Sequence, residues 1–409
     1  MRLPILPVLL IIVVGALIDL YIYRRIPREA VVARTRLRWR SVQFASGMFF
    51  AVMLAAALCL PRKSGTDAML ISVMWLLFTY FSVYAGKLVF IITDFIGGLP
   101  KAFRKPRIKA LTYAGATLGI IVFALMWWGA LINRFRTDIR EVDIEIPDLP
   151  TAFDGYRIVQ VSDMHVGTYG ADTTFLHKLV SEVNALHPDL IVFTGDIVNR
   201  HTAELLPHTT TLSGLKAPDG VISILGNHDY GDYATWTNEA EKLRDRELLY
   251  SLQKDMGWKL LRNETEWLKR GNDSLAIIGV ENIGEPPFSV YGDLKASYSG
   301  DLDDSNAKIL LSHNPMHWAN DIAGNEACNI ALTLSGHTHA MQIELFGISP
   351  AAWRYETWGG LYTDSLGHNL YVNIGTGTVG APMRIGATPE ITLFTLKGRN
   401  HTTSEATQQ

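Results

Sequence analysis

The sequence predicts a membrane region of about four helices followed by a layered α/β domain. Four long apolar runs lie within the first 137 of the 409 residues, and each is near the ~20 residues that cross a bilayer. Beyond residue 141, short apolar strands alternate with helical segments, as in layered α/β folds. The charge divides at the same point, with +14 over 1–137 and −17 over 138–409.

These observations predict three parts: a membrane domain over 1–137, a soluble domain over 138–397 and a polar tail over 398–409. A surface as acidic as that of the soluble part is unsuited to phosphate backbones, which excludes nucleic acid as the main partner. The expected partners are a phosphorylated small molecule or lipid and the membrane itself.

The membrane domain is expected to span the bilayer four times. The first run is too long for a signal peptide, has no small-residue cleavage site and is followed by further runs. Four such runs with basic connectors argue against buried helices of a soluble protein. The predicted spans are 5–23, 42–60, 68–93 and 110–132.

The connectors between the spans predict the orientation. The segment 23–40 carries seven arginines and 100–109 carries five Lys or Arg, whereas 61–67 has two basic residues and an aspartate. Because strongly positive loops stay in the cytoplasm, the N-terminus and everything after the fourth span should lie outside it. The sequence therefore predicts an integral protein of the inner or plasma membrane with an extracytoplasmic soluble domain.

Two charged residues, Asp19 and Lys87, fall inside the predicted spans, at similar depth near the cytoplasmic side. Charges at this depth either extend to the interface or pair with each other. We keep an ion pair between them as a hypothesis.

The soluble domain begins with an alternating segment, "REVDIEIPDLP", typical of a half-buried strand. "YRIVQVSD" predicts a buried strand, and "DTTFLHKLVSEVNALHP" predicts a helix that ends at Pro188. Further strands are predicted in "DLIVFTGD", "GVISILGNHD", "AKILLSHNP" and "IALTLSGHTH". Ligands of such sheets gather beyond the carboxyl ends of the strands.

Each of these strands ends in side chains that can bind metal. Taken singly, they could be helix caps or turn residues, but five consecutive strand ends of this kind are not expected by chance. The residues are Asp163 and His165, then Asp196, then Asn227, His228 and Asp229, then His313, and finally His337 and His339.

This order of motifs resembles the calcineurin-like metallophosphoesterase family, in particular a membrane-anchored bacterial branch. The resemblance covers roughly 141–397 and includes "LPTAFDGYRIVQVSDMH" at the start and "PEITLFTL" (389–396) at the end. All five metal-binding blocks are intact. The resemblance implies a four-layer α/β/β/α sandwich and a metal-dependent phosphoesterase.

The resemblance also implies two divalent metals that share Asp196. Asp163, His165 and His339 would complete one site, and Asn227, His313 and His337 the other. Imidazole, carboxylate and amide ligands suit Mn, Fe or Zn. His228 would protonate the leaving group or donate to the phosphate, with Asp229 orienting its other nitrogen.

Five further positions bear on the expected site. Asn199 stands where the purple-acid branch has tyrosine, which argues against a tyrosinate-bound ferric site. Ala340 and Met341 replace a Gly-Gly pair that often follows the last motif. Gly375 opens a Gly-Thr-Gly-Thr segment without the lysine of a phosphate loop, so we interpret it as a tight turn. Arg384 is either a phosphate contact or part of a structural salt bridge.

The expected substrate is a lipid-linked or cell-envelope phosphoester or pyrophosphate. The fourth span ends about 30 residues before Asp163, and 349–362 is rich in Trp and Tyr, which favour membrane interfaces. Relatives that cleave UDP-diacylglucosamine offer one alternative, although their substrate lies on the cytoplasmic side. A non-catalytic sensor of a phosphorylated ligand is another, and the intact His228-Asp229 pair argues against it.

Overall fold

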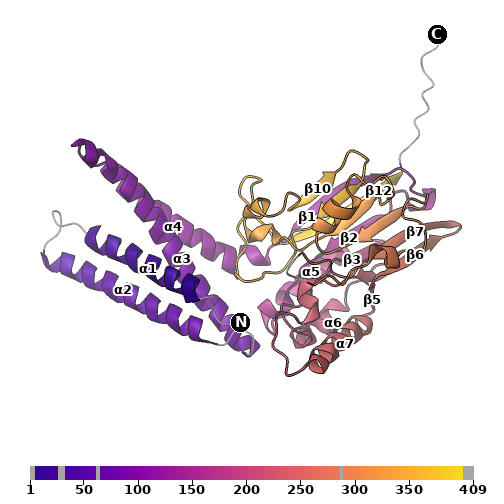
Figure 1. Ribbon diagram of the computed structural model, residues 1–409, viewed down its shortest axis with the longest axis horizontal. Helices are drawn as coiled ribbons and strands as arrows, with labels where there is room; N and C mark the ends of the chain where they lie inside the picture. Colours follow the sequence, from indigo (N-terminus) through magenta and orange to yellow (C-terminus); the bar gives the residue numbers. More distant parts are fainter. Residues whose placement is uncertain (1–4, 26–32, 61–64, 286–288, 399–409) are drawn as a thin grey trace, which may run out of the picture. The chain divides into compact units, whose positions relative to one another are not determined.

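The computed structural model describes residues 5–25, 33–60, 65–285 and 289–398. The chain forms two compact units, Met1–Ile132 with Gly380–Met383, and Asn133–Val379 with Arg384–Gln409. The predicted polar tail, 398–409, lies outside the described residues apart from Gly398. Figure 1 shows a helical unit and a unit built on β-sheets.

The helical unit contains four long helices: α1 (Ile5–Arg25), α2 (Ala33–Cys59), α3 (Asp67–Gly98) and α4 (Lys109–Leu131). Three stretches of the described chain are long and apolar enough to cross a membrane: Ala33–Cys59, Asp67–Phe103 and Lys109–Phe135. The predicted span 5–23 coincides with α1, a helix of 21 residues, but α1 is not among these three.

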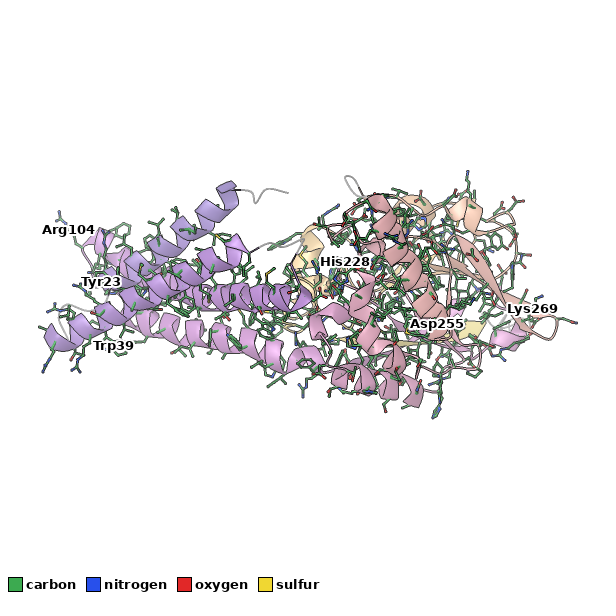
Figure 2. The ribbon with its side chains drawn as sticks, turned by 90° about the horizontal axis from the view of Figure 1, so that it is seen from below. Tyr23, Trp39, Arg104, His228, Asp255 and Lys269 are labelled. Atoms are coloured by element: carbon green, nitrogen blue, oxygen red, sulfur yellow. The ribbon has the colours of Figure 1, made fainter. Side chains whose placement is uncertain are left out.

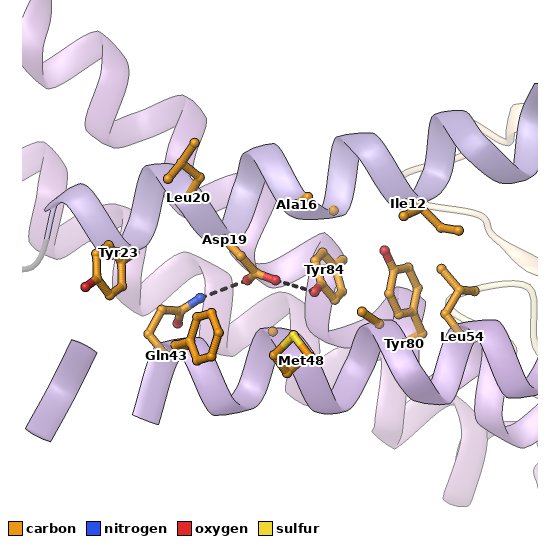
Figure 3. A pocket seen from close by; sticks show the side chains of 14 residues that line it. Ile12, Ala16, Asp19, Leu20, Tyr23, Gln43, Met48, Leu54, Tyr80 and Tyr84 are labelled. Carbon is orange, nitrogen blue, oxygen red and sulfur yellow. Dashed lines mark hydrogen bonds between the residues drawn. The ribbon is translucent and has the colours of Figure 1, made fainter. Parts of the chain in front are cut away.

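The ion pair that we hypothesised between Asp19 and Lys87 is present in the structure. Lys87 Nζ lies 2.7 Å from the Asp19 carboxylate, which also accepts hydrogen bonds from Tyr84 (2.6 Å) and Gln43 (2.8 Å). A side chain at Gly47 would collide with this carboxylate, so the glycine lets α2 approach it. The cluster lies at the edge of a cavity of about 460 Å³ with mostly apolar walls (Figure 3).

The second unit is a sandwich of two six-stranded mixed sheets. The strand order is β1-β12-β2-β3-β4-β5 in one sheet and β10-β11-β9-β8-β7-β6 in the other. The strands of the first sheet are β1 (Asp138–Ile146), β2 (Arg157–Val161), β3 (Leu190–Phe193), β4 (Val221–Ser223), β5 (Trp258–Leu260) and β12 (Glu390–Gly398). Those of the second are β6 (Glu264–Arg270), β7 (Asp273–Gly279), β8 (Lys308–Leu311), β9 (Leu332–Ser335), β10 (Gly360–Thr363) and β11 (Asn369–Val372).

Three hydrophobic clusters hold the layers together, because each strand places alternate side chains on opposite faces. Ile158 and Val192 point between the sheets, toward Ile309 and Leu334. The outer face of the first sheet packs against α5 (Thr174–Ala185), α6 (Thr209–Leu212) and α7 (Glu239–Asp255). The outer face of the second is covered by short segments that include α8 (Leu294–Ser297) and Trp318. This is the predicted four-layer α/β/β/α fold.

The sandwich brings the metal-type motifs to one edge. Strands β2, β3 and β4 run parallel in the first sheet, as do β8 and β9 in the second. Their carboxyl ends meet at the same side of the sandwich, since Asp163, Asp196 and His339, which follow β2, β3 and β9, have side-chain atoms within 4.8 Å of one another. Ligands of α/β sheets bind at such an edge. Apart from Arg157 at the start of β2, each strand is short and fully buried, so the polar residues that follow it emerge together at that edge.

Reversing the Asp19–Lys87 pair tests whether it stabilises the helical unit. Asp19→Lys and Lys87→Asp should each destabilise the unit by about 3 kcal/mol, because each leaves a poorly solvated charge unpaired. The double variant should recover most of the folded yield, measured by size-exclusion chromatography in detergent. Lys105→Asp, in an exposed connector, is the control. A double variant no better than either single one would show that the pair contributes nothing.

Candidate metal centre

The seven predicted ligands all follow directly on the converging strands. Asp163 and His165 come after β2, Asp196 after β3 and Asn227 after β4. His313 follows β8, and His337 and His339 follow β9. Asp163, Asp196 and the histidines other than His337 are buried, whereas Asn227 and His337 are partly exposed. Protein atoms thus shield the cluster from solvent except at Asn227 and His337.

Five of these residues adopt the left-handed backbone conformation that favours glycine. Their φ angles are +51° for Asp163, +44° for His165, +60° for Asp196, +74° for His337 and +51° for His339. Non-glycine residues are uncommon there, and held strain of this kind clusters at functional sites. Each strand-to-loop turn therefore bends so that its ligand faces the others.

Glycines next to the ligands allow their close approach. Gly195 has φ +96°, and a side chain on it would collide with the backbone of Gly226. A methyl group on Gly226 would in turn collide with the Asp196 carboxylate. One on Gly336 would collide with Asp163. The motifs of Asp196, Asn227 and His337 thus each need the glycine that precedes them for close packing.

The first group of ligands is Asp163, His165, Asp196 and His339, whose ligand atoms all lie within 4.8 Å of one another. His165 Nε2 is 3.0 Å from His339 Nε2, and His339 Nε2 is 3.2 Å from Asp163 Oδ1. Ligands bound at about 2.1 Å with angles of roughly 90–110° would stand about 3.0–3.4 Å apart. The separations therefore fit one metal ion.

The second group is Asp196, His313 and His337, with the Asn227 amide beside them. Asn227 Oδ1 lies 2.8 Å from His337 Nδ1, and His313 Nε2 lies 3.2 Å from Asp196 Oδ2. The same Oδ2 atom faces His165 Nε2 at 3.6 Å. One carboxylate oxygen thus stands between the two groups, where a bridging ligand belongs.

The hydrogen bonds of the imidazole rings favour a metal at their inner nitrogens. His165 Nδ1 contacts the Val198 carbonyl at 3.1 Å, and His313 Nδ1 contacts the Thr194 carbonyl at 2.7 Å. A carbonyl only accepts, so each Nδ1 donates and a neutral ring turns its Nε2 lone pair toward the carboxylates. His313 Nε2 is buried without a hydrogen-bond partner. A divalent cation would satisfy these inward-facing lone pairs.

The two buried carboxylates create a field that favours positive charge. Burial alone would raise the pKa of Asp163, but the nearby His339 and His313 lower it well below its usual range. Burial opposes a charge on His313, yet Asp196 outweighs that effect and raises the pKa of His313 to about 10. A bound divalent metal would satisfy the same field and would take the place of the proton.

Comparison with known proteins decides the family. Residues 156–341 match the model of the "Calcineurin-like phosphoesterase" family, and residues 1–134 match "Probable Calcineurin-like phosphoesterase, transmembrane domain". A Danio rerio protein named "Transmembrane protein with metallophosphoesterase domain" is 30% identical over 402 residues, which cover 93% of this chain and 86% of the relative. The chain belongs to the calcineurin-like metallophosphoesterase family. It is a membrane-associated hydrolase whose buried Asp/His cluster suits divalent metals.

Two bacterial relatives resemble the metallophosphoesterase over a shorter length. "Uncharacterized metallophosphoesterase YkuE" of Bacillus subtilis is 35% identical and covers 62% of this chain and 82% of the relative. "UDP-2,3-diacylglucosamine pyrophosphatase LpxG" of Chlamydia trachomatis is 29% identical and covers 54% of this chain and 75% of the relative. Relatives of the chain thus occur in both bacteria and vertebrates.

The expected role of Asp229 in orienting His228 is wrong. His228 Nδ1 contacts the carbonyl of Asn199 at 2.6 Å. Asp229 is buried and accepts the backbone N–H groups of Gly226 and Asp196, both at 2.8 Å. Burial and the charge of Asp196 raise its pKa to about 7. Asp229 therefore joins the turns that carry two of the metal-binding blocks, which explains why a carboxylate is placed there.

The alternative of a phosphate contact for Arg384 is also wrong. The side chain is fully buried and donates to the carbonyls of Gly377 (2.7 Å), Ile374 (2.9 Å) and Ala387 (3.0 Å). It makes no salt bridge within the described residues; its remaining contact is His339 Nδ1 at 3.2 Å. With its donors used in this way, Arg384 positions the loop behind His339 and cannot reach a substrate.

Two tyrosines that the sequence did not single out contact the cluster. Tyr355 Oη lies 3.1 Å from His337 Nε2. Asn227 Nδ2 donates to Tyr233 Oη at 2.9 Å, which turns the amide oxygen toward His337. The ring of Tyr233 also stacks on His228, with centroids 4.1 Å apart. No spacing signal identified them, although Tyr355 lies in the aromatic segment 349–362.

The turn after the last motif carries backbone strain. Ala340, Met341 and Gln342 have φ angles of +50°, +45° and +61°, the conformation for which the common Gly-Gly pair is suited. Ala340 is buried against Ile374 and Ala387, whereas Met341 is largely exposed. The substitution therefore leaves the path of the chain intact and introduces strain.

Replacing Met341 isolates that strain. Met341→Gly should be about 1 kcal/mol more stable than Met341→Ala, because only glycine adopts a positive φ without steric cost. This gain exceeds the larger conformational entropy that a glycine loses on folding. Thermal unfolding of both variants at the same metal concentration measures the difference. The alanine variant is the matched control, since both remove the same exposed side chain. Equal unfolding temperatures would rule out strain at this position.

Proposed function

We propose that this metallophosphoesterase holds two divalent metals, Mn, Fe or Zn, and hydrolyses a lipid-linked or cell-envelope phosphoester or pyrophosphate. The main support is the Asp196 Oδ2 atom, which lies 3.6 Å from His165 Nε2 and 3.2 Å from His313 Nε2. Bound in two such sites, the metals supply Lewis-acid activation of water and of the phosphoryl oxygen. Asp163, His165 and His339 would hold one metal, and Asn227, His313 and His337 the other.

His228 is placed to transfer a proton to the leaving group. It is partly exposed and stands at the rim of the buried cluster, in edge contact with the ring of His165. Its Nδ1 is held by the Asn199 carbonyl, and its backbone N–H donates to Asp196 at 2.8 Å. Because the carbonyl only accepts, Nδ1 is fixed as the donor, and Nε2 is the ring nitrogen that would carry the transferred proton. His228 is therefore our proposed general acid.

The proposed role of His228 can be separated from metal binding. His228→Ala should retain about two metals by elemental analysis and lose about 10²–10⁴-fold in turnover on esters with poor leaving groups. On an aryl phosphodiester the loss should be smaller, because p-nitrophenolate leaves without a proton. Lost metal would show that His228 is a ligand. Full activity would show that His228 takes no part in catalysis and overturn its role as general acid.

An exposed apolar rim beside the cluster supports a lipid substrate. The rim consists of Met341, Leu345, Phe346, Ile348 and Trp353. Phe346 is fully exposed, and Trp353 and Ile348 are 90% and 73% exposed. The segment is tied to the cluster at both ends, since it begins two residues after His339 and ends two residues before Tyr355, which contacts His337. Exposed apolar side chains next to a site mark a lipid or protein contact, and Trp favours the membrane interface.

The rim predicts a difference between membrane-bound and soluble substrates. Phe346→Ser with Trp353→Ser should lower activity on a phosphorylated lipid in vesicles about tenfold, since burying one such side chain is worth roughly 1.5 kcal/mol. Activity on a soluble aryl phosphate should stay unchanged. Leu206→Ser with Leu366→Ser removes two exposed apolar residues elsewhere in the catalytic unit and serves as the control. Equal activity of both double variants on vesicles would exclude a role for the rim.

A UDP-diacylglucosamine-type pyrophosphatase is the second candidate function. It is favoured by the similarity to the Chlamydia trachomatis relative that carries that activity in its name. Both candidates use the same metal cluster, and they differ in the side of the membrane on which the substrate lies. The basic connectors 23–40 and 100–109 support an extracytoplasmic catalytic unit, and hence the first candidate.

Fusion reporters decide between the two sides. Alkaline phosphatase fused to the C-terminus should be active and green fluorescent protein at the same place should be dark, because each folds productively on one side only. Both fusions should be present in similar amounts by immunoblot. The opposite pattern would put the catalytic unit in the cytoplasm and favour the pyrophosphatase.

A further inference from the structure

A second polar centre in the helical unit lies where the two basic connectors begin. It borders a recess of about 260 Å³ whose walls include Arg25 at the end of α1, Asp94 near the end of α3, and Lys101 and Arg107 beyond it. Among the described residues that line the recess, three cations surround one carboxylate, an excess of two positive charges. None of these residues takes part in the metal centre.

Asp94 is fully occupied by its present partners. Its side chain is buried and accepts hydrogen bonds from Tyr21 (2.7 Å), Arg25 Nε (2.7 Å), Thr112 (2.8 Å) and Arg107. These contacts join α1 and α3 to the segment that opens α4. The carboxylate can therefore neutralise no more than one of the surrounding charges.

Several donors around the recess remain available. Arg25 contacts Asp94 through Nε and Nη2, which leaves Nη1 of its guanidinium. Arg107 Nε is buried without a hydrogen-bond partner. Lys101 makes no ion pair within the described part of the chain and is exposed. A buried donor that lacks an acceptor costs free energy, and an anion in the recess would satisfy it.

The larger cavity beside Asp19 offers no such charge. There Lys87 balances the carboxylate, and most of the lining residues are apolar. An anion would gain no net attraction in that cavity. Charge complementarity therefore directs an anionic ligand to the smaller recess.

We propose that the recess binds the phosphate of an anionic phospholipid headgroup. Arg25 and Lys101 stand at the ends of apolar helices, and the same end of the helical unit carries Tyr23 and Trp39 (Figure 2), residue types typical of a membrane interface. Phe95 and Leu99 add apolar walls beside the cations, suited to the glycerol and upper acyl chain. Basic pockets between transmembrane helices are known to suit such headgroups.

Lys101 is the residue with which to test this site, because it takes no part in the Asp94 network and its replacement should not affect folding. Native mass spectrometry of the full chain in neutral detergent would follow binding of phosphatidylglycerol, phosphatidylcholine and inorganic phosphate. Lys105→Gln is the matched control: it makes the same charge change four residues away, and it does not border the recess.

We expect wild type and Lys105→Gln to bind phosphatidylglycerol in preference to phosphatidylcholine. Lys101→Gln should bind it about fivefold more weakly, the effect of removing one cation near an anionic headgroup. An equal loss in both variants would reduce the effect to general attraction by a basic surface and overturn the site. Absence of a preference over phosphatidylcholine would also overturn it. Inorganic phosphate bound as tightly as phosphatidylglycerol would show that the ligand is free phosphate and overturn the lipid assignment.

Discussion

The metal centre depends on one unfavourable arrangement: two buried carboxylates lie among four imidazoles, of which only His337 is partly exposed. Burying a charge without compensation is unfavourable, and Asp163 and Asp196 are almost completely buried. The inner nitrogens of His165 and His313 add lone pairs that point at the same carboxylates. Positive charge between the carboxylates stabilises this cluster, and the surrounding loops place the side chains so that cations can bind there.

The sandwich supplies the rigidity that this arrangement needs. The candidate ligands come from both sheets, since Asp163 and Asp196 follow strands of one sheet and His313 and His339 follow strands of the other. The apolar core between the sheets fixes the distance between the two sets of strand ends. Because each strand end is buried and short, the strained left-handed turns are held in place by packing rather than by their own preference.

Much of this was predictable from the sequence, because strand ends followed by Asp, His and Asn signal the ligands directly. What could not be predicted depends on tertiary contacts. The partner of His228 is the backbone carbonyl of Asn199, and every residue has such a carbonyl, so the residue type does not identify the partner. A buried Arg384 looks the same in sequence as one that faces a phosphate. Tyr355 reaches His337 across a loop whose path is set by the fold. Helix α1 has the length of a span, although it is not among the three stretches of the described chain that are apolar enough to cross a membrane.

The two units differ in how their buried carboxylates are neutralised. In the catalytic unit, acidic groups gather to hold cations, whereas in the helical unit Asp19 and Asp94 are each matched by basic partners. Each aspartate ties helices together, since leaving it unpaired in an apolar medium would be costly. Only at Asp94 do the partners exceed the carboxylate in charge. The membrane part therefore has its own preference for anions at the end where its connectors are most basic.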